Sequence, residues 1–274
     1  MPSKIKRLFH RDSFAKRLSA AKQARQCADI PKVNDAGKVT TYKGAPVQIM
    51  HNGVRIFSGC YHGERMTKII EVLKGHHEPQ EEKVFHEVLR YVPEDGTMLE
   101  VGCFWAYYSL WFSHQLPKRK NFLIEPVAWK RVIAELNFIL NEKSVEVDSC
   151  YIEDPEICLQ ESTASEEAFL KDARAVSIDA YMVEKGLDRL DILHADIQGA
   201  ELSLLQSATH SLESHSIDYL FLSTHKGRHT PCIHFLKERN YKIIAEHTPE
   251  ESHSADGLIV AAGLSAPFRE NIPI

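Results

Sequence analysis

The stretch Met98–Ser109, "MLEVGCFWAYYS", decides the fold class of this chain of 274 residues. Its first residues are typical of a buried strand that ends at Gly102, and a helix is predicted to begin near Trp105. In α/β proteins, a strand that passes through a glycine directly into a helix makes room for a nucleotide-like ligand. The stretch therefore predicts an α/β protein with a binding site at the carboxyl end of this strand.

The chain after this stretch continues as alternating strands and helices. Predicted strands cover 120–125, 144–152, 191–196 and 217–224, and predicted helices cover 106–116, 127–141, 162–173, 177–186, 200–213 and 231–240. Such alternation indicates a mostly parallel sheet. Only eight residues separate the last two strands, 241–247 and 256–263, which is too few for a parallel crossover and predicts an antiparallel pair. A mostly parallel sheet with a terminal antiparallel strand is the Rossmann-like class I methyltransferase fold.

The chain before this core is predicted to have two parts. Residues 1–37 form a basic arm, 38–93 form a small α+β extension of short strands and helices, and 94–274 form the core domain. The arm has apolar residues at helical spacing, and we favour a helix that docks on the domain or on a partner protein. Two other interpretations stay open, a helix on an anionic membrane surface and an organellar transit peptide.

The composition excludes several classes of protein. The formal net charge of -5 and the sequence pI of about 6.3 argue against a surface that binds nucleic acid. The six cysteines contain no C-x-x-C pair and suit free thiols in a reducing cytosol, so a cytoplasmic protein is expected. Among the fifteen histidines, His225 and His229 are four residues apart but precede the predicted helix, so helical ligand geometry fails. His76 and His77 fall in a predicted turn at the surface, and no metal is expected.

Acidic residues follow the predicted parallel strands at the edge where open α/β sheets bind ligands. The strand ends carry, in chain order, Glu100, Gly102, Glu125, Asp196 and His225. Glu125 lies 23 residues after Gly102, which is the position from which an acid binds a ribose diol. The site is therefore predicted to bind a ligand that contains a ribose.

The loop after the first strand distinguishes between two such ligands. Ala106 stands where a dinucleotide-binding loop has its third glycine, which weakens the case for a pyrophosphate. S-adenosylmethionine has no phosphate, and its amine and sulfonium suit a carboxylate and aromatic faces. We therefore expect S-adenosylmethionine, held by Glu100, Gly102, Trp105, Ala106, Tyr107, Glu125 and Asp196.

Four segments resemble the FkbM-type methyltransferases. They are "MLEVGCFWAYYSLWF", "FLIEP" with "LNFILN", "SIDAYMVEKGLDRLDILHADIQGAELSLLQSA" and "LFLSTH", within a resemblance that runs from about Glu78 to Gly257. "DIQGAE" is the most specific of these matches. The resemblance implies a class I fold, S-adenosylmethionine as cofactor, and methyl transfer to a hydroxyl of a sugar, glycan or polyketide. The chain departs from the family pattern at Phe104, Ala106 and His194, where Asn, Gly and Lys are usual.

Two residues are predicted to activate the acceptor. Asp196 ends the strand expected beside the first one, and His225 follows the next strand, so both face the methyl end of the cofactor. A neutral His225 ring would take the hydroxyl proton as a general base. Either residue could instead position the acceptor or hold a metal ion. Glu201 is expected either to join this chemistry or to bond backbone N–H groups. Ala106 preserves the turn if its φ is negative.

Three function classes follow from these observations. The first is an S-adenosylmethionine-dependent O-methyltransferase that acts on a small-molecule or glycan acceptor, with no nucleic-acid partner. The second is an NAD(P)-dependent oxidoreductase, against which the missing third glycine and the antiparallel pair weigh. The third is a non-catalytic binding protein on a methyltransferase scaffold, which Phe104 and Ala106 would suit.

Overall fold

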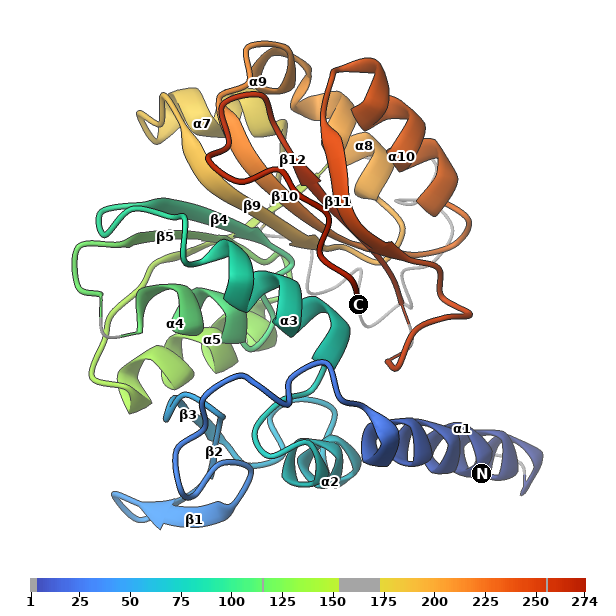
Figure 1. Cartoon of the computed structure of the whole chain (residues 1–274). Coiled ribbons are helices and arrows are strands. Elements are labelled where there is room, and N and C mark those ends of the chain that lie inside the picture. The colour runs from blue at the N-terminus through green and yellow to red at the C-terminus, as the bar shows by residue number, and fades with distance from the viewer. Residues whose placement is uncertain (1–3, 115, 153–172, 255) are drawn as a thin grey trace. The chain divides into compact units, whose positions relative to one another are not determined.

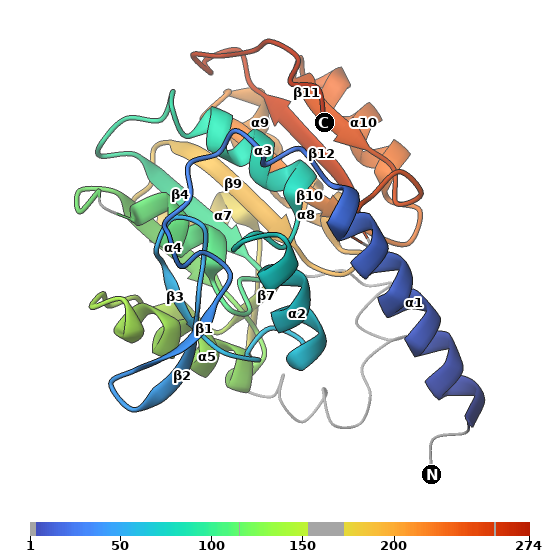
Figure 2. The ribbon, with the colours of Figure 1, turned by 60° about the horizontal axis from the view of Figure 1, so that its bottom comes forward.

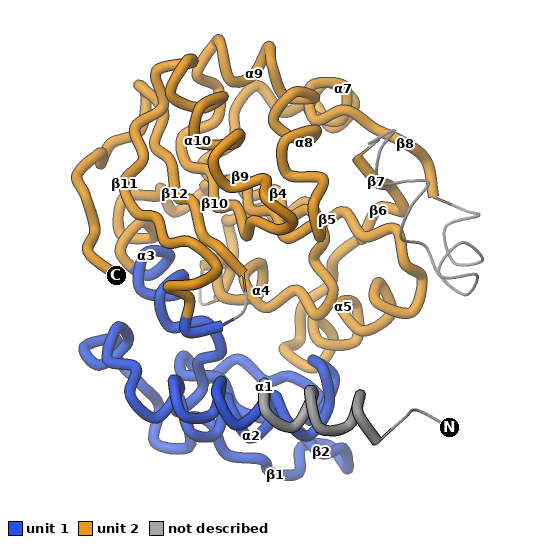
Figure 3. The backbone as a smooth tube through the Cα atoms, turned by 90° about the vertical axis from the view of Figure 1, so that its right-hand side faces the viewer, with its two compact units in different colours: residues 1–86, 253–255 blue, residues 87–252, 256–274 orange. Residues whose placement is uncertain are grey.

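The computed structural model describes residues 4–114, 116–152, 173–254 and 256–274, with side chains from Phe14 onward. The chain divides into two compact units, residues 1–86 with 253–255 and residues 87–252 with 256–274 (Figure 3). The division falls within helix α3 (Pro79–Val88), whereas the sequence suggested a separate arm and a boundary at 93. The start of α3 belongs to the first unit because Cys27 Sγ donates to the Pro79 carbonyl and His253 N donates to Gln80 Oε1.

The first unit contains a three-stranded antiparallel sheet and two helices before α3. Its elements are α1 (Lys4–Gln23), β1 (Val39–Tyr42), β2 (Ala45–Ile49), β3 (Arg55–Phe57) and α2 (Glu64–Val72). Helix α1 lies beside α2 (Figure 2). Phe14, Leu18 and Ala21 of α1 pack with Met66 and Ile69 of α2. The described end of the basic arm therefore docks on its own unit, whereas contact with a membrane or a partner protein stays a prediction.

The second unit is built on a seven-stranded sheet with the order β11-β12-β10-β9-β4-β5-β6. These strands are β4 (Thr97–Val101), β5 (Lys120–Ile124), β6 (Val147–Asp148), β9 (Leu190–Asp196), β10 (Ile217–Thr224), β11 (Lys242–His247) and β12 (Gly257–Ala262). Strand β12 is antiparallel to β10 and β11, and the other pairs are parallel. The predicted α/β class I fold and its antiparallel pair are confirmed, although β12 inserts beside β10 rather than extending the edge.

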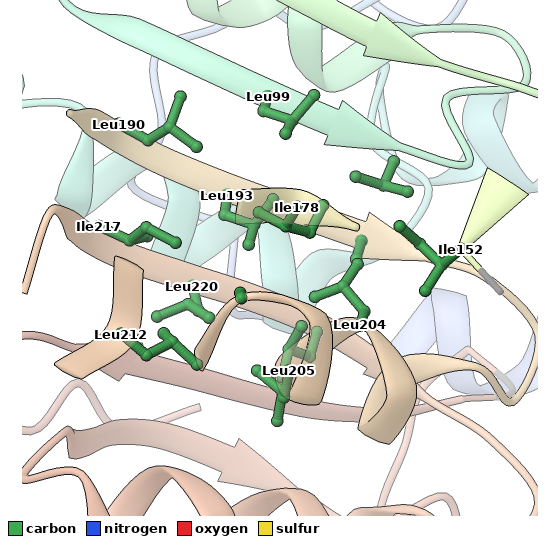
Figure 4. Close-up of a cluster of buried hydrophobic side chains, with 14 of the residues drawn as sticks. Leu99, Ile152, Ile178, Leu190, Leu193, Leu204, Leu205, Leu212, Ile217 and Leu220 are labelled. Carbon is green, nitrogen blue, oxygen red and sulfur yellow. The ribbon is translucent and has the colours of Figure 1, made fainter. Parts of the chain in front are cut away.

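Helices cover both faces of this sheet (Figure 1). Helices α4 (Tyr107–Ser113) and α5 (Ala128–Leu140) lie on one side, and the other side carries α7 (Ile178–Glu184), α8 (Glu201–Ser207), α9 (Thr209–Glu213) and α10 (His229–Glu238). Leu99, Leu193 and Leu220 of the strands pack with Ile178 and Leu204 in the core on this second side (Figure 4). The described helices include none that is long and apolar enough to cross a membrane.

Three predicted elements differ in detail from the structure. The strand predicted over 144–152 is divided into β6 and β7 (Cys150–Ile152), and β7 pairs with β8 (Arg174–Val176) in a separate parallel sheet. The helix predicted over 200–213 is divided at Ala208 into α8 and α9. The helix predicted over 162–173 lies, apart from its last residue, outside the described residues.

The end of β4 packs directly against the end of β9. Val101 pairs with Ala195 in the parallel register, so the next residues, Gly102 and Asp196, lie level with one another. A Cβ atom on Gly102 would lie 2.1 Å from the Asp196 carbonyl oxygen, and the φ of Gly102 is +79°. Only glycine therefore allows the two strand ends to approach this closely.

We expect Gly102→Ala to destabilise the second unit more than Gly186→Ala does. Gly186 also has a positive φ, +64°, but a Cβ there would meet no atom within 4 Å, so it isolates the conformational cost of about 1–2 kcal/mol. The clash with Asp196 should add about 1–3 kcal/mol at Gly102. Urea unfolding of both variants measures the difference, and equal losses would contradict the close packing.

Candidate functional site

The loop between β4 and α4, residues 102–106, has an unusual backbone. Phe104 and Ala106 have positive φ values of 41° and 57°, in addition to Gly102. The negative φ that was the condition for Ala106 to preserve the turn is not found. Ala106 N donates to the Cys103 carbonyl at 2.6 Å, and Ala106 is the N-cap residue of α4. A left-handed conformation costs about 1–2 kcal/mol at a residue with a Cβ atom, so the loop is strained. Such strain concentrates at binding and catalytic sites.

Two buried carboxylates and one amide hold this loop in place. Glu125 Oε2 accepts a hydrogen bond from Phe104 N at 3.2 Å, and Glu125 Oε1 accepts one from Val127 N at 2.9 Å. Glu100 Oε2 accepts one from Ser109 N at 3.0 Å, within the first turn of α4. Asn137 Nδ2 of α5 donates to the Trp105 carbonyl at 3.0 Å. The acids selected from the sequence are therefore anchors of the loop, whatever else they bind.

The two carboxylates fit S-adenosylmethionine in their chemistry. Each ionised carboxylate oxygen accepts more than one hydrogen bond, so Glu125 retains capacity for a ribose hydroxyl and Glu100 for the amine. Burial raises the pKa of the Glu125 carboxyl, and Lys130 opposes that shift. The assignment of both residues to the cofactor stays a prediction.

The aromatic residues of the loop are less available than the sequence suggested. Trp105 is 5% exposed and Tyr107 is 0% exposed. Their rings stack on one another at 5.1 Å between centroids, and Tyr107 also contacts Trp111 at 5.8 Å. In this arrangement Tyr107 offers no free face to a ligand. Its ring instead packs within the apolar surface that the loop and α4 share.

His225 lies among three carboxylates at the carboxyl edge of the sheet. Its Nδ1 is 2.8 Å from Glu201 Oε1, and its Nε2 is 3.0 Å from Asp256 Oδ1 and 3.6 Å from Asp196 Oδ1. Asp196 Oδ1 also accepts a hydrogen bond from Gln198 Nε2 at 2.9 Å. The structure therefore brings together Asp196 and His225, the two residues predicted for acceptor activation.

The protonation state of His225 differs from the expectation. Burial opposes a charge on the ring, but hydrogen bonds to Asp256 and Glu201 and the charge of Asp196 raise the pKa of His225 to about 10. The ring is an imidazolium at neutral pH and has no free lone pair for a hydroxyl proton. His225 is therefore a cation that positions the neighbouring carboxylates, and not the neutral general base that the sequence suggested.

The sequence analysis missed one member of this cluster, Asp256, and left the role of Glu201 open. Asp256 comes to the edge because β12 is antiparallel and its first residue, Gly257, pairs with Thr224 at the end of β10. The predicted antiparallel pair contained this signal, since such a strand begins where its parallel neighbours end. Glu201 Oε1 accepts a hydrogen bond from Gly199 N at 2.8 Å, as one of its two interpretations expected, and it also holds His225.

Sheet order and site together define the class of protein. The central β4, the loop after it, and the antiparallel β12 next to β10 are the features of a class I methyltransferase. Residues 77–243 match the methyltransferase FkbM domain family, and the chain belongs to that family. It is an S-adenosylmethionine-dependent methyltransferase, which decides against the oxidoreductase and the non-catalytic binding protein.

Solved structures that are similar to this chain include other methyltransferases. M. capricolum TrmK, in complex with S-adenosyl-homocysteine, is 12% identical over 67% of this chain and 69% of that chain, with a TM-score of 0.42. The ribosomal protein L11 methylase from Lactobacillus delbrueckii subsp. bulgaricus is 16% identical over 69% and 81%, with a TM-score of 0.41. The precorrin-6y C5,15-methyltransferase from Geobacter metallireducens is 16% identical over 66% and 86%, with a TM-score of 0.39. No protein with a curated description matches the sequence.

We expect Glu125→Gln to weaken binding of S-adenosylhomocysteine by about 1.5–3 kcal/mol, the range for hydrogen bonds to charged groups. The amide has one acceptor oxygen and cannot hold two backbone N–H groups and a ribose hydroxyl together. Calorimetry measures the affinity, with Glu135→Gln on the exposed face of α5 as the control. An analogue of S-adenosylhomocysteine without the ribose 2′-hydroxyl should bind wild type more weakly than the parent compound does. On the variant, the two compounds should bind with equal affinity. Full discrimination by the variant would contradict the ribose assignment.

We expect His225→Gln to destabilise the protein by about 1.5–3 kcal/mol at pH 6 and by less at pH 9. The folded-state pKa of about 10 lies above the usual unfolded value of about 6.5. The stabilisation is therefore complete below pH 6.5 and is lost as the pH rises toward 10. Urea unfolding at both pH values measures this, with His234→Gln on the exposed face of α10 as the control. A loss that is constant with pH would show that the ring is neutral.

Proposed function

We propose that this methyltransferase transfers a methyl group to a hydroxyl of a neutral, polyhydroxylated acceptor, such as a sugar, a glycan or a polyketide-like natural product. The observation that carries the proposal is the close packing of Gly102 against the main chain of Asp196. It supports a site in which the Asp196 carboxylate lies beside the loop predicted to hold the cofactor. An acceptor hydroxyl bound by Asp196 would then lie near the cofactor's methyl group.

Asp196 and His225 have different roles in the activation of the acceptor. S-adenosylmethionine, when bound, supplies a sulfonium methyl that an oxygen nucleophile displaces in line, so orientation of the acceptor contributes much of the rate. Asp196, whose side chain is 35% exposed, accepts the hydroxyl proton as the oxygen forms its bond to the methyl carbon. His225, 10% exposed and charged, orients Asp196 and stabilises its negative charge.

The charges of the cluster favour a neutral acceptor. Asp196, Glu201 and Asp256 contribute three carboxylates around the single imidazolium of His225. Carboxylates accept hydrogen bonds from hydroxyl groups and repel phosphates, and the whole chain has a formal net charge of -5. A polyhydroxylated molecule therefore suits this edge of the sheet better than a nucleic acid does.

Labelled S-adenosylmethionine and the full-length chain test the proposal. Neutral glycans and polyketide alcohols should accept the label, whereas transfer RNA and protein should not. Asp196→Asn should lower kcat by about 10²–10⁴-fold, the usual contribution of a general base. The exposed Asp188→Asn is the control and should retain wild-type turnover. Label in transfer RNA alone, or full turnover by Asp196→Asn on a hydroxyl acceptor, would contradict the proposal.

A further inference from the structure

The first unit contains a buried group of three metal-ligating side chains that the methyl transfer does not use. Cys27, His76 and Glu82 are all buried, and one ligand atom from each lies within 4.8 Å of the other two. His76 and His77 were expected at the surface of a turn, but they are 0% and 2% exposed. They lie between α2 and α3, where the Glu82 carboxylate contacts Nδ1 of both rings.

The two ring nitrogens of His76 have different surroundings. Its Nδ1 contacts Glu82 Oε2, and its ring stacks on His51 at 4.2 Å between centroids, so the imidazole is held on two sides. Among the residues that the structure describes, its Nε2 is buried without a hydrogen-bond partner. Nε2 lies on the opposite edge of the ring from Glu82, so an ion that His76 and Glu82 share would lie at Nδ1 and replace their hydrogen bond.

The carboxylate of Glu82 is preorganised by the start of α3. Its Oε1 accepts hydrogen bonds from His77 N at 2.7 Å and from Glu78 N at 3.1 Å. These contacts fix the carboxylate beside His76 Nδ1, so that the two ligand atoms face one another. Cys27 completes the group from the segment after α1, where its Sγ donates only a weak hydrogen bond to the Pro79 carbonyl at 3.2 Å.

We propose that Cys27, His76 and Glu82 bind a zinc ion. A thiolate, an imidazole and a carboxylate are the three donor types that Zn²⁺ uses, whereas Mg²⁺ and Ca²⁺ require oxygen ligands. Tetrahedral Zn²⁺ places its ligand atoms about 3.3–3.8 Å apart, so a separation within 4.8 Å closes with a small movement of the side chains. The thiol releases its proton to solvent on binding, and a water molecule completes the coordination.

The ion would link two segments that are distant in the chain. Cys27 follows α1, whereas His76 and Glu82 lie at the junction of α2 and α3. A metal that closes this long loop stabilises the folded first unit, because the unfolded chain does not hold the three ligands together. The role is structural, and it is independent of the acceptor and the cofactor.

Metal analysis of the untagged full-length protein tests this inference. After incubation with zinc and dialysis, wild type should retain one zinc ion per chain by inductively coupled plasma mass spectrometry. Cys27→Ser and His76→Gln should lose it, whereas Cys60→Ser, a half-buried cysteine of the same unit, should retain it. Removal of zinc with a chelator should lower the Tm of wild type and of Cys60→Ser but not that of Cys27→Ser.

Cobalt substitution of wild type decides the outcome even if the variants fail to fold. A Co²⁺ ion bound to a cysteine thiolate gives a charge-transfer absorption in the near ultraviolet, and this band should appear when cobalt is added to the metal-free protein. Wild type without retained zinc, cobalt binding without the thiolate band, or full zinc retention by Cys27→Ser would each overturn the proposal.

Discussion

The close packing of Gly102 against the carbonyl of Asp196 is the constraint on which the second unit depends. The parallel register of β4 and β9 brings these residues level, and the missing Cβ atom lets the two main chains meet. The strained loop after β4 and the polar end of β9 are consequently neighbours. The loop predicted to hold the cofactor and the acidic cluster proposed to bind the acceptor therefore meet at one strand boundary.

The loop after β4 shows how buried charges can serve two purposes. Glu100 and Glu125 hold backbone N–H groups of the loop and of the helix start, which stabilises a backbone that Phe104 and Ala106 make unfavourable. The same carboxylates retain acceptor capacity for a ligand. Since these anchors are also the predicted ligand contacts, ligand binding would require no new ordering of the loop.

The two buried polar clusters differ in how their charges are compensated. In the second unit, His225 is a cation among Glu201, Asp256 and Asp196, and the ring and carboxylates stabilise one another. In the first unit, His76 has one nitrogen satisfied by Glu82 and one without a partner among the described residues. The excess of carboxylates around His225 suits hydrogen bonds to an acceptor's hydroxyl groups, whereas the thiol, imidazole and carboxylate of the first unit suit the proposed zinc ion.

The sequence by itself determined the fold class, the antiparallel pair and the strand ends that carry the site. Periodicity, loop length and the placement of glycine are local properties, so "MLEVGCFWAYYS" and the short connection before Asp256 were sufficient. Only the tertiary structure decided the charge of His225, because that charge depends on burial and on carboxylates from the end of β9, the start of α8 and the residue before β12. For the same reason, the left-handed Ala106 and the buried pair of His76 and Glu82 emerged only from packing, which brings together residues that no spacing in the sequence relates.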